Sequence, residues 1–395
     1  MKKLMKVLAI VISAAMVFSL AACNGLGGKE ETTDEPGTLA QAGTVAIPKE
    51  EIKIGVLHIT SIEETSGYTF AHHKGIVEMK ESLGLKDNQI IEKDWIDDND
   101  KKATTTAIQE LIDEGCHVIF ATSFNYMDTM EEFAAKDEYQ DIVFSHCSGY
   151  KSNPDNFNNY FGRIYESRYL AGIAAGLKAQ ELETPMLGFV AAQDVNNAEV
   201  TGGINAWALG IQSVYPEAKV FVSVTGSWYA PEDEGKAAQA LIDKGCVVLG
   251  QHSDSDATQT VAEKNGKFGC GYNSDMTPFA KDAHLCAPIW NWGVYYTKAV
   301  SEVINGEWKP VNYYEGMNVG LIDLSPLNPD TIAPGTEEKV AEAKAAIADG
   351  SLVVFDDSLV DNKGNKIVGE GEDGRLSDEQ ITGGINYYIQ GVELL

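Results

Sequence analysis

From residue 53 onward, short apolar runs alternate with amphipathic stretches. The runs have the length of buried strands, and the stretches repeat their apolar positions every three to four residues, as helices do. This alternation gives parallel sheets covered by helices on both faces, so the sequence predicts an α/β protein. Strands are predicted at 53–57, 117–120, 142–144 and 187–190, and helices around 79–83, 107–112 and 168–179.

A segment of fourteen residues occurs twice, which indicates two similar lobes. Residues 107–120 and 237–250 are identical at eight positions, at an offset of 130 residues. Each copy has the pattern of a helix end, a glycine at the helix terminus and the next strand. Chance likeness between two such junctions is the alternative. In two doubly wound lobes, the ligand crevice lies at the carboxyl ends of the strands, where the lobes face each other.

The N-terminus has the pattern of an export signal with a lipid attachment site. Three lysines precede an uncharged apolar stretch at 7–20, which is short for a membrane span. Small residues then lead to Cys23. This pattern is similar to the lipobox of bacterial lipoproteins, which implies a signal peptide at 1–22 and lipid on the Cys23 thiol. The alternative is an ordinary signal peptide with an incidental cysteine.

Composition divides the remainder of the chain. Residues 23–50 are rich in Gly, Thr, Glu and Pro and lack apolar periodicity, so we expect a flexible tether that begins with the lipidated cysteine. The first lobe is expected to comprise 51–165 with about 280–315. The second is expected to comprise 166–279 with about 316–395, including a C-terminal hinge crossing.

The charge balance excludes one class of partner. The chain of 395 residues has 30 Lys and Arg against 59 Asp and Glu, a net charge of −29, whereas a nucleic-acid surface needs clustered cations. Apolar residues make up 44% of the chain, enough for two cores. Cys116 and Cys246 stand at equivalent helix-to-strand junctions of the repeated segment, where a cysteine is normally buried. The five internal cysteines together are too few for a disulfide scaffold and lack C-x-x-C spacing. They are Cys116, Cys147, Cys246, Cys270 and Cys286.

Aromatic and polar side chains gather directly after the predicted strands, in the loops 66–72, 122–128, 227–229, 251–256, 271–276 and 290–293. Flat rings beside Asn and Asp suit a flat ligand with hydrogen-bond donors, because rings stack on its faces and amides or carboxylates bind its edge. Any single aromatic residue of this set is also a candidate for the core. The ligand-binding candidates are Tyr68, Thr69, Asn125, Trp228, Asp254, Asp275, Trp290 and Asn291.

The order and spacing of several motifs resemble the basic membrane protein family of substrate-binding lipoproteins, which includes the PnrA-like purine nucleoside receptors of ABC importers. The likeness runs from about Ile52 to Leu395. It implies the type I periplasmic-binding-protein fold, in which two α/β lobes joined by several hinge crossings enclose the ligand. The motifs are Thr122-Ser-Phe-Asn-Tyr-Met-Asp128, 160–172, Gly203-Ile-Asn-Ala206, Ser227-Trp228, Gln251-His-Ser-Asp254, Gly271-Tyr-Asn-Ser-Asp-Met276 and Trp290-Asn-Trp-Gly293.

The resemblance also implies roles for particular residues. Tyr68 and Trp228 stand where the family places two aromatic rings that sandwich a purine. Asp275 stands at a ligand-binding aspartate, and Asn125 stands close to the position of another. Trp290 aligns with a lysine that holds the ribose hydroxyls in nucleoside receptors. Loss of that cation favours a free purine base over a nucleoside.

Signatures of catalysis are weak. The sequence has no Gly-x-Ser-x-Gly elbow and no Walker loop. His72 and His73 would point about 100° apart on a helix, so they cannot chelate a metal as an i, i+4 pair does. His252, Asp254 and Asp256 alternate in a strand-end loop, which is a weak metal signal. We therefore expect no catalysis, no cofactor and no metal.

These features predict a solute receptor for an ABC importer, lipid-anchored on the extracytoplasmic face of the cell membrane. The expected ligand is a purine base or nucleoside bound between the lobes by hinge closure. The expected partners are an ABC permease and, through the lipid, the membrane; no nucleic acid is expected, and the chain is expected to be monomeric. Two alternatives stay open: a receptor for another small polar solute such as a sugar, and a ligand-sensing signalling lipoprotein of the same fold.

Overall fold

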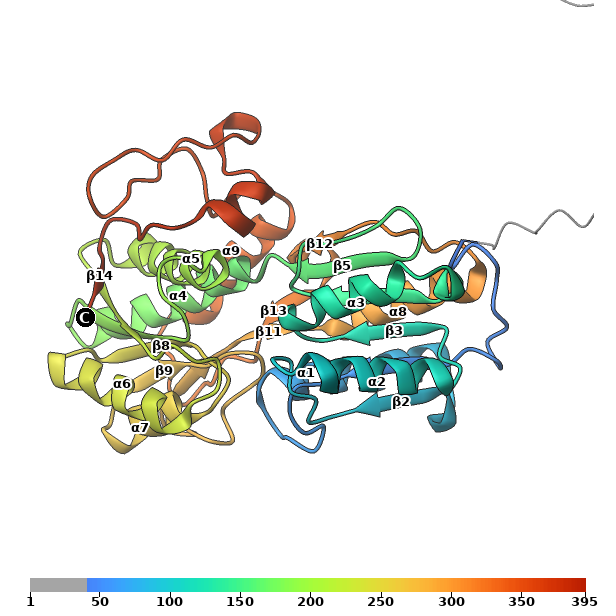
Figure 1. Cartoon of the computed structure of the whole chain (residues 1–395). Coiled ribbons are helices and arrows are strands. Elements are labelled where there is room, and N and C mark those ends of the chain that lie inside the picture. Colours follow the sequence, from blue (N-terminus) through green and yellow to red (C-terminus); the bar gives the residue numbers. More distant parts are fainter. Residues whose placement is uncertain (1–40) are drawn as a thin grey trace, which may run out of the picture. The chain divides into compact units, whose positions relative to one another are not determined.

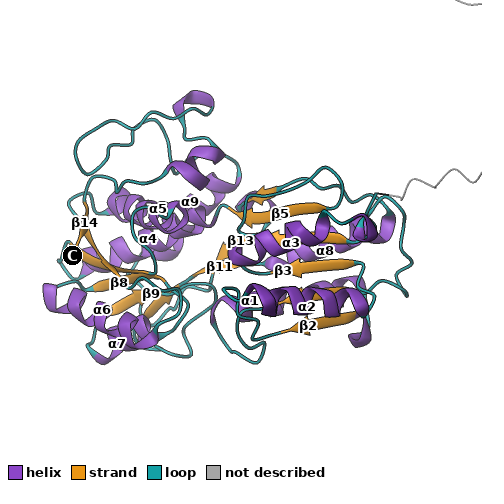
Figure 2. Cartoon of the chain, viewed as in Figure 1, coloured by secondary structure: helices purple, strands orange, loops and turns teal. Residues whose placement is uncertain are grey.

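The computed structural model describes residues 41–395, and the expected signal peptide and Cys23 lie outside them. Two six-stranded parallel sheets form the cores of two α/β lobes (Figure 1). Helices cover the sheets (Figure 2), which is why strands such as β1 (Ile54–Leu57) and β8 (Val248–His252) are buried along their whole length. The predicted α/β class with two doubly wound lobes is confirmed.

The first lobe is built on a sheet with the strand order β12-β5-β4-β3-β1-β2. Its remaining strands are β2 (Ile90–Lys93), β3 (Val118–Ala121), β4 (Val143–Cys147), β5 (Phe157–Gly162) and β12 (Tyr313–Glu315). Its helices are α1 (Gly67–Leu83), α2 (Lys101–Asp113), α3 (Met127–Ala134) and α8 (Trp292–Asn305), with short 3₁₀ turns at Asp87–Gln89, Phe124–Tyr126 and Asp137–Tyr139.

The second lobe is built on a sheet with the order β10-β9-β8-β6-β7-β14. Its other strands are β6 (Met186–Ala191), β7 (Lys219–Val224), β9 (Phe268–Cys270), β10 (His284–Cys286) and β14 (Val392–Leu394). Its helices are α4 (Ile164–Glu181), α5 (Ala198–Val214), α6 (Pro231–Lys244), α7 (Ala257–Lys264) and α9 (Thr336–Ala348), with short helical turns at Met317–Val319, Glu372–Gly374 and Gln380–Gly384.

Three crossings join the lobes. The first leads from β5 to α4, and the others contain β11 (Pro288–Trp290) and β13 (Ile322–Leu324), which pair as an antiparallel ribbon. The return to the first lobe was expected at about residue 280, but the structure keeps β10 in the second sheet and crosses at β11. The difference arises because 284–286 is a short strand that sequence patterning does not separate from the crossing that follows it.

The two copies of the repeated segment occupy equivalent places. In each lobe the helix ends at a glycine with positive φ, Gly115 at 80° and Gly245 at 110°, and the following strand enters the sheet centre. A side chain would be strained at these φ values. Cys116 and Cys246 follow directly and are buried in both copies.

The end of the expected tether packs on the first lobe. Ala42 is buried, and an added Cβ at Gly43 would come within 2.6 Å of the Trp308 side chain. The Gln89 side-chain amide donates to the Lys49 carbonyl at 2.7 Å. Residues 41–50 therefore belong to the folded part, because they cover a tryptophan that would otherwise face water.

Candidate functional site

Three adjoining cavities open between the lobes at the carboxyl ends of the strands. The central cavity has a volume of about 560 Å³, and an outer cavity of about 290 Å³ shares five of its residues. A third, the hinge cavity, has about 580 Å³ and reaches the first crossing at Gly162. Volumes of roughly 300–1,000 Å³ are typical of small-molecule sites. The central cavity is lined by Ile59, Tyr68, Asp98, Asn99, Ser123, Phe124, Asn125, Ser148, Phe161, Gln193, Asn197, Glu199, Gly226, Ser227, Trp228, Tyr229, Asp254 and Tyr272.

The first lobe contributes three of the expected residues to the cavities. Tyr68 lies in the first turn of α1 and packs edge-on against His72, with ring centroids 4.5 Å apart. Thr69 lines only the outer cavity, and its hydroxyl accepts a hydrogen bond from Thr60 at 2.8 Å. Asn125 lines the central cavity and donates to an Asp98 carboxylate oxygen at 3.2 Å.

The second lobe contributes Trp228 and Asp254. Trp228 lies between β7 and α6, and its carbonyl accepts the Asp254 backbone N–H at 2.8 Å. The Asp254 carboxylate accepts from the Asn273 side-chain amide at 2.8 Å. Asn273 has φ of 65°, a left-handed conformation that Asn tolerates better than most residues. The turn therefore holds the Asp254 carboxylate in the cavity wall that Trp228 also lines.

Burial dominates the electrostatics of Asp254. Loss of hydration raises the pKa of this carboxyl to about 7; the Asn273 hydrogen bond acts against the shift, and nearby Glu234, Glu199 and Glu64 add to it. Below pH 7 the protonated form of Asp254 therefore predominates in the ligand-free fold, so this group makes its largest contribution to stability below its unfolded pKa and loses it as pH rises through 7. A bound hydrogen-bond donor would favour the ionised form instead.

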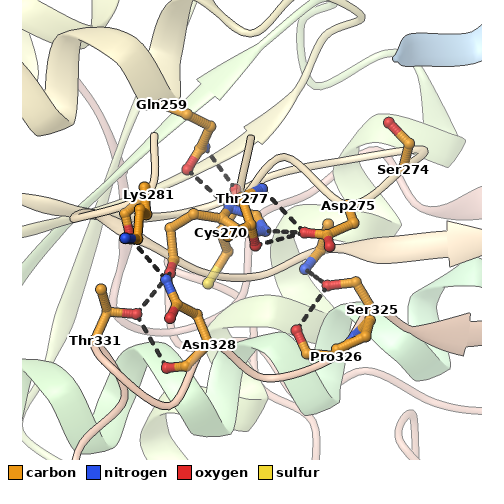
Figure 3. Close-up of polar contacts among 12 residues, drawn as sticks. Gln259, Cys270, Ser274, Asp275, Thr277, Lys281, Ser325, Pro326, Asn328 and Thr331 are labelled. Carbon is orange, nitrogen blue, oxygen red and sulfur yellow. Dashed lines mark hydrogen bonds and ion pairs between the residues drawn. The ribbon is translucent and has the colours of Figure 1, made fainter. Parts of the chain in front are cut away.

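Asp275 does not reach the cavities. Its carboxylate accepts from the Thr277 N–H at 2.9 Å and from the Thr277 hydroxyl at 2.6 Å. Figure 3 shows Asp275 directed at Thr277, while the neighbouring Ser274 side chain points elsewhere. Ser274 instead accepts the Gly67 N–H of the first lobe at 3.3 Å. The Asp275 carboxylate is thus held in a local turn outside the three cavities, and the adjacent residue makes the contact between lobes.

Trp290 and Asn291 belong to the hinge. Trp290 is buried and stacks on Trp292 at 4.3 Å, with Phe161 at 4.9 Å on the cavity side. The Asn291 side chain donates to the Gly320 carbonyl at 3.0 Å and so ties two crossings together. Neither residue lines the three cavities in the described chain. Trp290 therefore lies behind the cavity wall and contacts Phe161, which lines the central cavity.

Sequence patterning missed several lining residues. Phe124 lies in the loop 122–128 and Tyr272 lies in the loop 271–276, and both residues line the central cavity. Their position directly after a strand is the sequence signal that could have identified them. Phe161 is the penultimate residue of β5 and lies in a motif that carried the family resemblance. Glu199 lies in the first turn of α5, where an acid in an acidic chain gave no signal.

The lining is acidic and aromatic. Across residues 41–395, neither the central nor the outer cavity is lined by a Lys, Arg or His, while Asp98, Glu199 and Asp254 line the central cavity. The described residues also contain no group of three or more His, Cys, Asp and Glu that could hold a metal ion. Such a lining disfavours anions and suits a flat ligand that donates hydrogen bonds.

Comparison with known proteins gives one family. The sequence model described as ABC transporter substrate-binding protein PnrA-like matches residues 52–351. A purine-binding protein of Brucella abortus is 35% identical over 353 residues, covering 89% of this chain and 95% of the relative. A putative ABC transporter glucose-binding protein of Haloferax volcanii is 31% identical over 403 residues, covering 97% and 95%.

A solved structure agrees on the fold. The solute-binding protein of an Aeropyrum pernix ABC transporter superposes with a TM-score of 0.64 at 15% identity, covering 86% of this chain and all of the other. The expected type I periplasmic-binding-protein fold is thereby confirmed. Between residues 41 and 395, none of the helices has the length and apolar character needed to span a bilayer.

Proposed function

The chain belongs to the PnrA-like family of ABC transporter substrate-binding proteins, and from this premise we propose that it binds a purine base between its lobes. Members of this family bind small molecules outside the cytoplasm and work with ABC permeases; they are solute-binding proteins rather than enzymes. The finer proposal names the ligand class and its place in the cleft.

One observation carries the proposal: aromatic rings from both lobes and carboxylates meet around a cavity without cations. Tyr68 and Trp228 come from opposite lobes, so they can stack on the two faces of a flat ring once the lobes close. Asp254 lies beside Trp228 and can accept from the N–H groups on the ring edge.

The same lining favours a free base over a nucleoside. The family resemblance implies that nucleoside receptors hold the ribose hydroxyls with a lysine. Within the described residues, no lysine lines the central or the outer cavity. Phosphorylated ligands are disfavoured more strongly, because their charge would face Asp98, Glu199 and Asp254 without a counter-ion.

A sugar is the second candidate. The Haloferax volcanii relative is named a putative glucose-binding protein, and rings with carboxylates also suit the hydroxyl groups of a sugar. A thermal-shift panel of the purified protein with adenine, guanine, adenosine, guanosine, a pyrimidine and glucose distinguishes the two. A ligand at about one hundred times its Kd adds roughly 2.7 kcal/mol of stability. Stabilisation by glucose alone would select the sugar, and substrate turnover would contradict the proposed binding role.

Binding of a purine base is expected to release protons near pH 7. A ligand N–H that donates to Asp254 lowers the pKa of that carboxyl from about 7, so the complex holds fewer protons and affinity rises with pH from about 5.5 to 7.5. Calorimetric titrations at pH 7 in two buffers with different ionisation enthalpies measure the release. Asp254→Asn should abolish it. Equal apparent enthalpies for the unmodified protein in both buffers would contradict the role of Asp254.

We also propose that Cys23 anchors the protein to the membrane through lipid. The residue lies outside the described part of the chain, so the support is the sequence pattern that precedes it. Cys23→Ser is expected to move the protein from the membrane fraction to the soluble fraction, as judged by fractionation and by labelling with a radioactive fatty acid. Ser19→Ala is a matched control that leaves the cysteine in place. Unchanged membrane retention of Cys23→Ser would contradict the anchor.

A further inference from the structure

His252 is the buried centre of the second-lobe wall. It is the last residue of β8 and has no exposed surface. Its ring lies 4.6 Å from that of Tyr272 and 5.8 Å from that of Trp228, both of which line the central cavity. Its Nε2 lies 3.2 Å from the Glu199 Oε1, and Glu199 is a third residue that lines the central cavity. Three separate parts of the cleft wall therefore meet at one imidazole.

The other nitrogen of His252 lies in the neighbourhood of a buried cation. Arg168 of α4 is fully buried, with its guanidinium 3.9 Å from the centre of the Tyr272 ring and one nitrogen donating to the Gln251 carbonyl. The Arg168 Nε and the His252 Nδ1 have no hydrogen-bond partner among residues 41–395. A Cβ built on Gly203 would lie 3.2 Å from Nδ1 and 3.4 Å from Nε, so both nitrogens converge on that glycine.

This arrangement selects one form of the imidazole. A proton on Nδ1 would have no acceptor among the described residues and would lie near the Arg168 cation, whereas a proton on Nε2 meets the Glu199 carboxylate. Burial, with a contribution from Arg168, lowers the pKa of His252 to about 4, and the Glu199 bond only partly opposes this. The ring is therefore neutral at pH 7 and donates its Nε2–H to Glu199.

We propose that Glu199 is a specificity-determining residue of the cleft and that His252, oriented by Arg168, positions it. The His252 bond is the one hydrogen bond that the Glu199 side chain makes in the described chain, which leaves its second oxygen available to a ligand N–H. Glu199 lines both the central and the hinge cavity. The inference rests on the proposed function, because it assigns a residue that recognises the ligand of the same site.

The proposed positioning of Glu199 by His252 can be tested on the ligand-free protein. Nitrogen-15 NMR of the histidine side chains at pH 7, with His252 assigned from the signals missing in His252→Gln, should show a neutral ring protonated on Nε2. Gly203→Ala should shift these signals, because its methyl meets the imidazole. Gly202→Ala is the matched control, since its methyl meets only Ile385 Cδ1 at 3.5 Å. A positively charged His252 ring, or a neutral ring with its proton on Nδ1, would contradict the proposed positioning of Glu199 by His252.

Calorimetric titration with adenine tests the recognition part. Glu199→Gln should weaken binding at least about tenfold, as expected for a lost charge-assisted hydrogen bond, and Glu217→Gln, an equal charge change on an exposed loop, should not. His252→Gln, whose amide can reach the Nε2 position, should retain more affinity than His252→Asn. Equal adenine affinity in Glu199→Gln and the unmodified protein would overturn the inference. Absence of purine binding by the unmodified protein would instead refute the proposed function and, with it, the assignment of Glu199.

Discussion

Gly172→Ala is expected to lower the free energy of unfolding by about 3 kcal/mol, because the added methyl group would clash with the backbone of the neighbouring helix. An added Cβ at Gly172 would lie 2.1 Å from the Trp207 carbonyl oxygen, and one at Gly210 would lie 2.0 Å from the Tyr169 carbonyl oxygen. The backbones of α4 and α5 are thus in direct contact at this point. Rigid backbone, unlike the end of a flexible side chain, cannot move aside without separating the two helices.

Gly202→Ala is the matched control for this prediction. It lies on α5, and its methyl would meet only Ile385 Cδ1 at an ordinary 3.5 Å. Replacing glycine by alanine within a helix is worth roughly 0.5–1 kcal/mol of stability, so this variant should be unchanged or slightly more stable. Urea unfolding of both variants measures the difference. A Gly172→Ala protein as stable as Gly202→Ala would show that the helices do not approach as described.

Trp228→Ala is expected to weaken purine binding at least about tenfold while leaving the ligand-free melting temperature nearly unchanged. Trp228 is 37% exposed, so its truncation should cost the ligand-free fold much less than the loss of a fully buried tryptophan. Truncating an aromatic anchor that a ligand covers costs about 2 kcal/mol or more, which exceeds a factor of ten. Trp228→Phe should lose less, because a flat face remains.

Trp290→Ala should show the opposite pattern. Trp290 is 3% exposed and packs against both Trp292 and Phe161, so its loss should cost about 3–5 kcal/mol of stability and affect affinity only through the cavity wall. Calorimetric titration with adenine and thermal unfolding of both variants separate the two roles. If the folded Trp228→Ala variant bound adenine as tightly as the unmodified protein, Trp228 would not be a ligand-binding residue and the proposed stacking of a purine between Tyr68 and Trp228 would be wrong.

The fold could be predicted from sequence because its signals are local and repeated. Continuous apolar runs such as Val118–Ala121 predict fully buried parallel strands, and Gly115 and Gly245 mark the same helix end in both lobes. The second crossing, at β11, could not be located in the same way. Strands of three residues, such as β10, give too short a pattern to distinguish from a loop.

The site could be predicted only to the level of loops. Parallel strands end at one edge of a sheet, so residues after strands gather there, as Trp228 and Asp254 do. Periodicity does not say which way a loop side chain turns: at the left-handed Asn273 the chain changes direction, and Asp275 binds Thr277 instead of facing the cleft. Glu199 gave no signal because its role depends on His252, which lies more than fifty residues away in sequence.

The central claim is that a purine base occupies the cavity between the lobes, and calorimetric titration of the unmodified protein tests it most directly. Adenine and guanine are titrated alongside adenosine, guanosine and glucose at pH 7.5. The account predicts saturable binding of a free base at a stoichiometry of one, tighter than binding of its nucleoside or of glucose. Saturable binding of glucose with no heat from either base would contradict it.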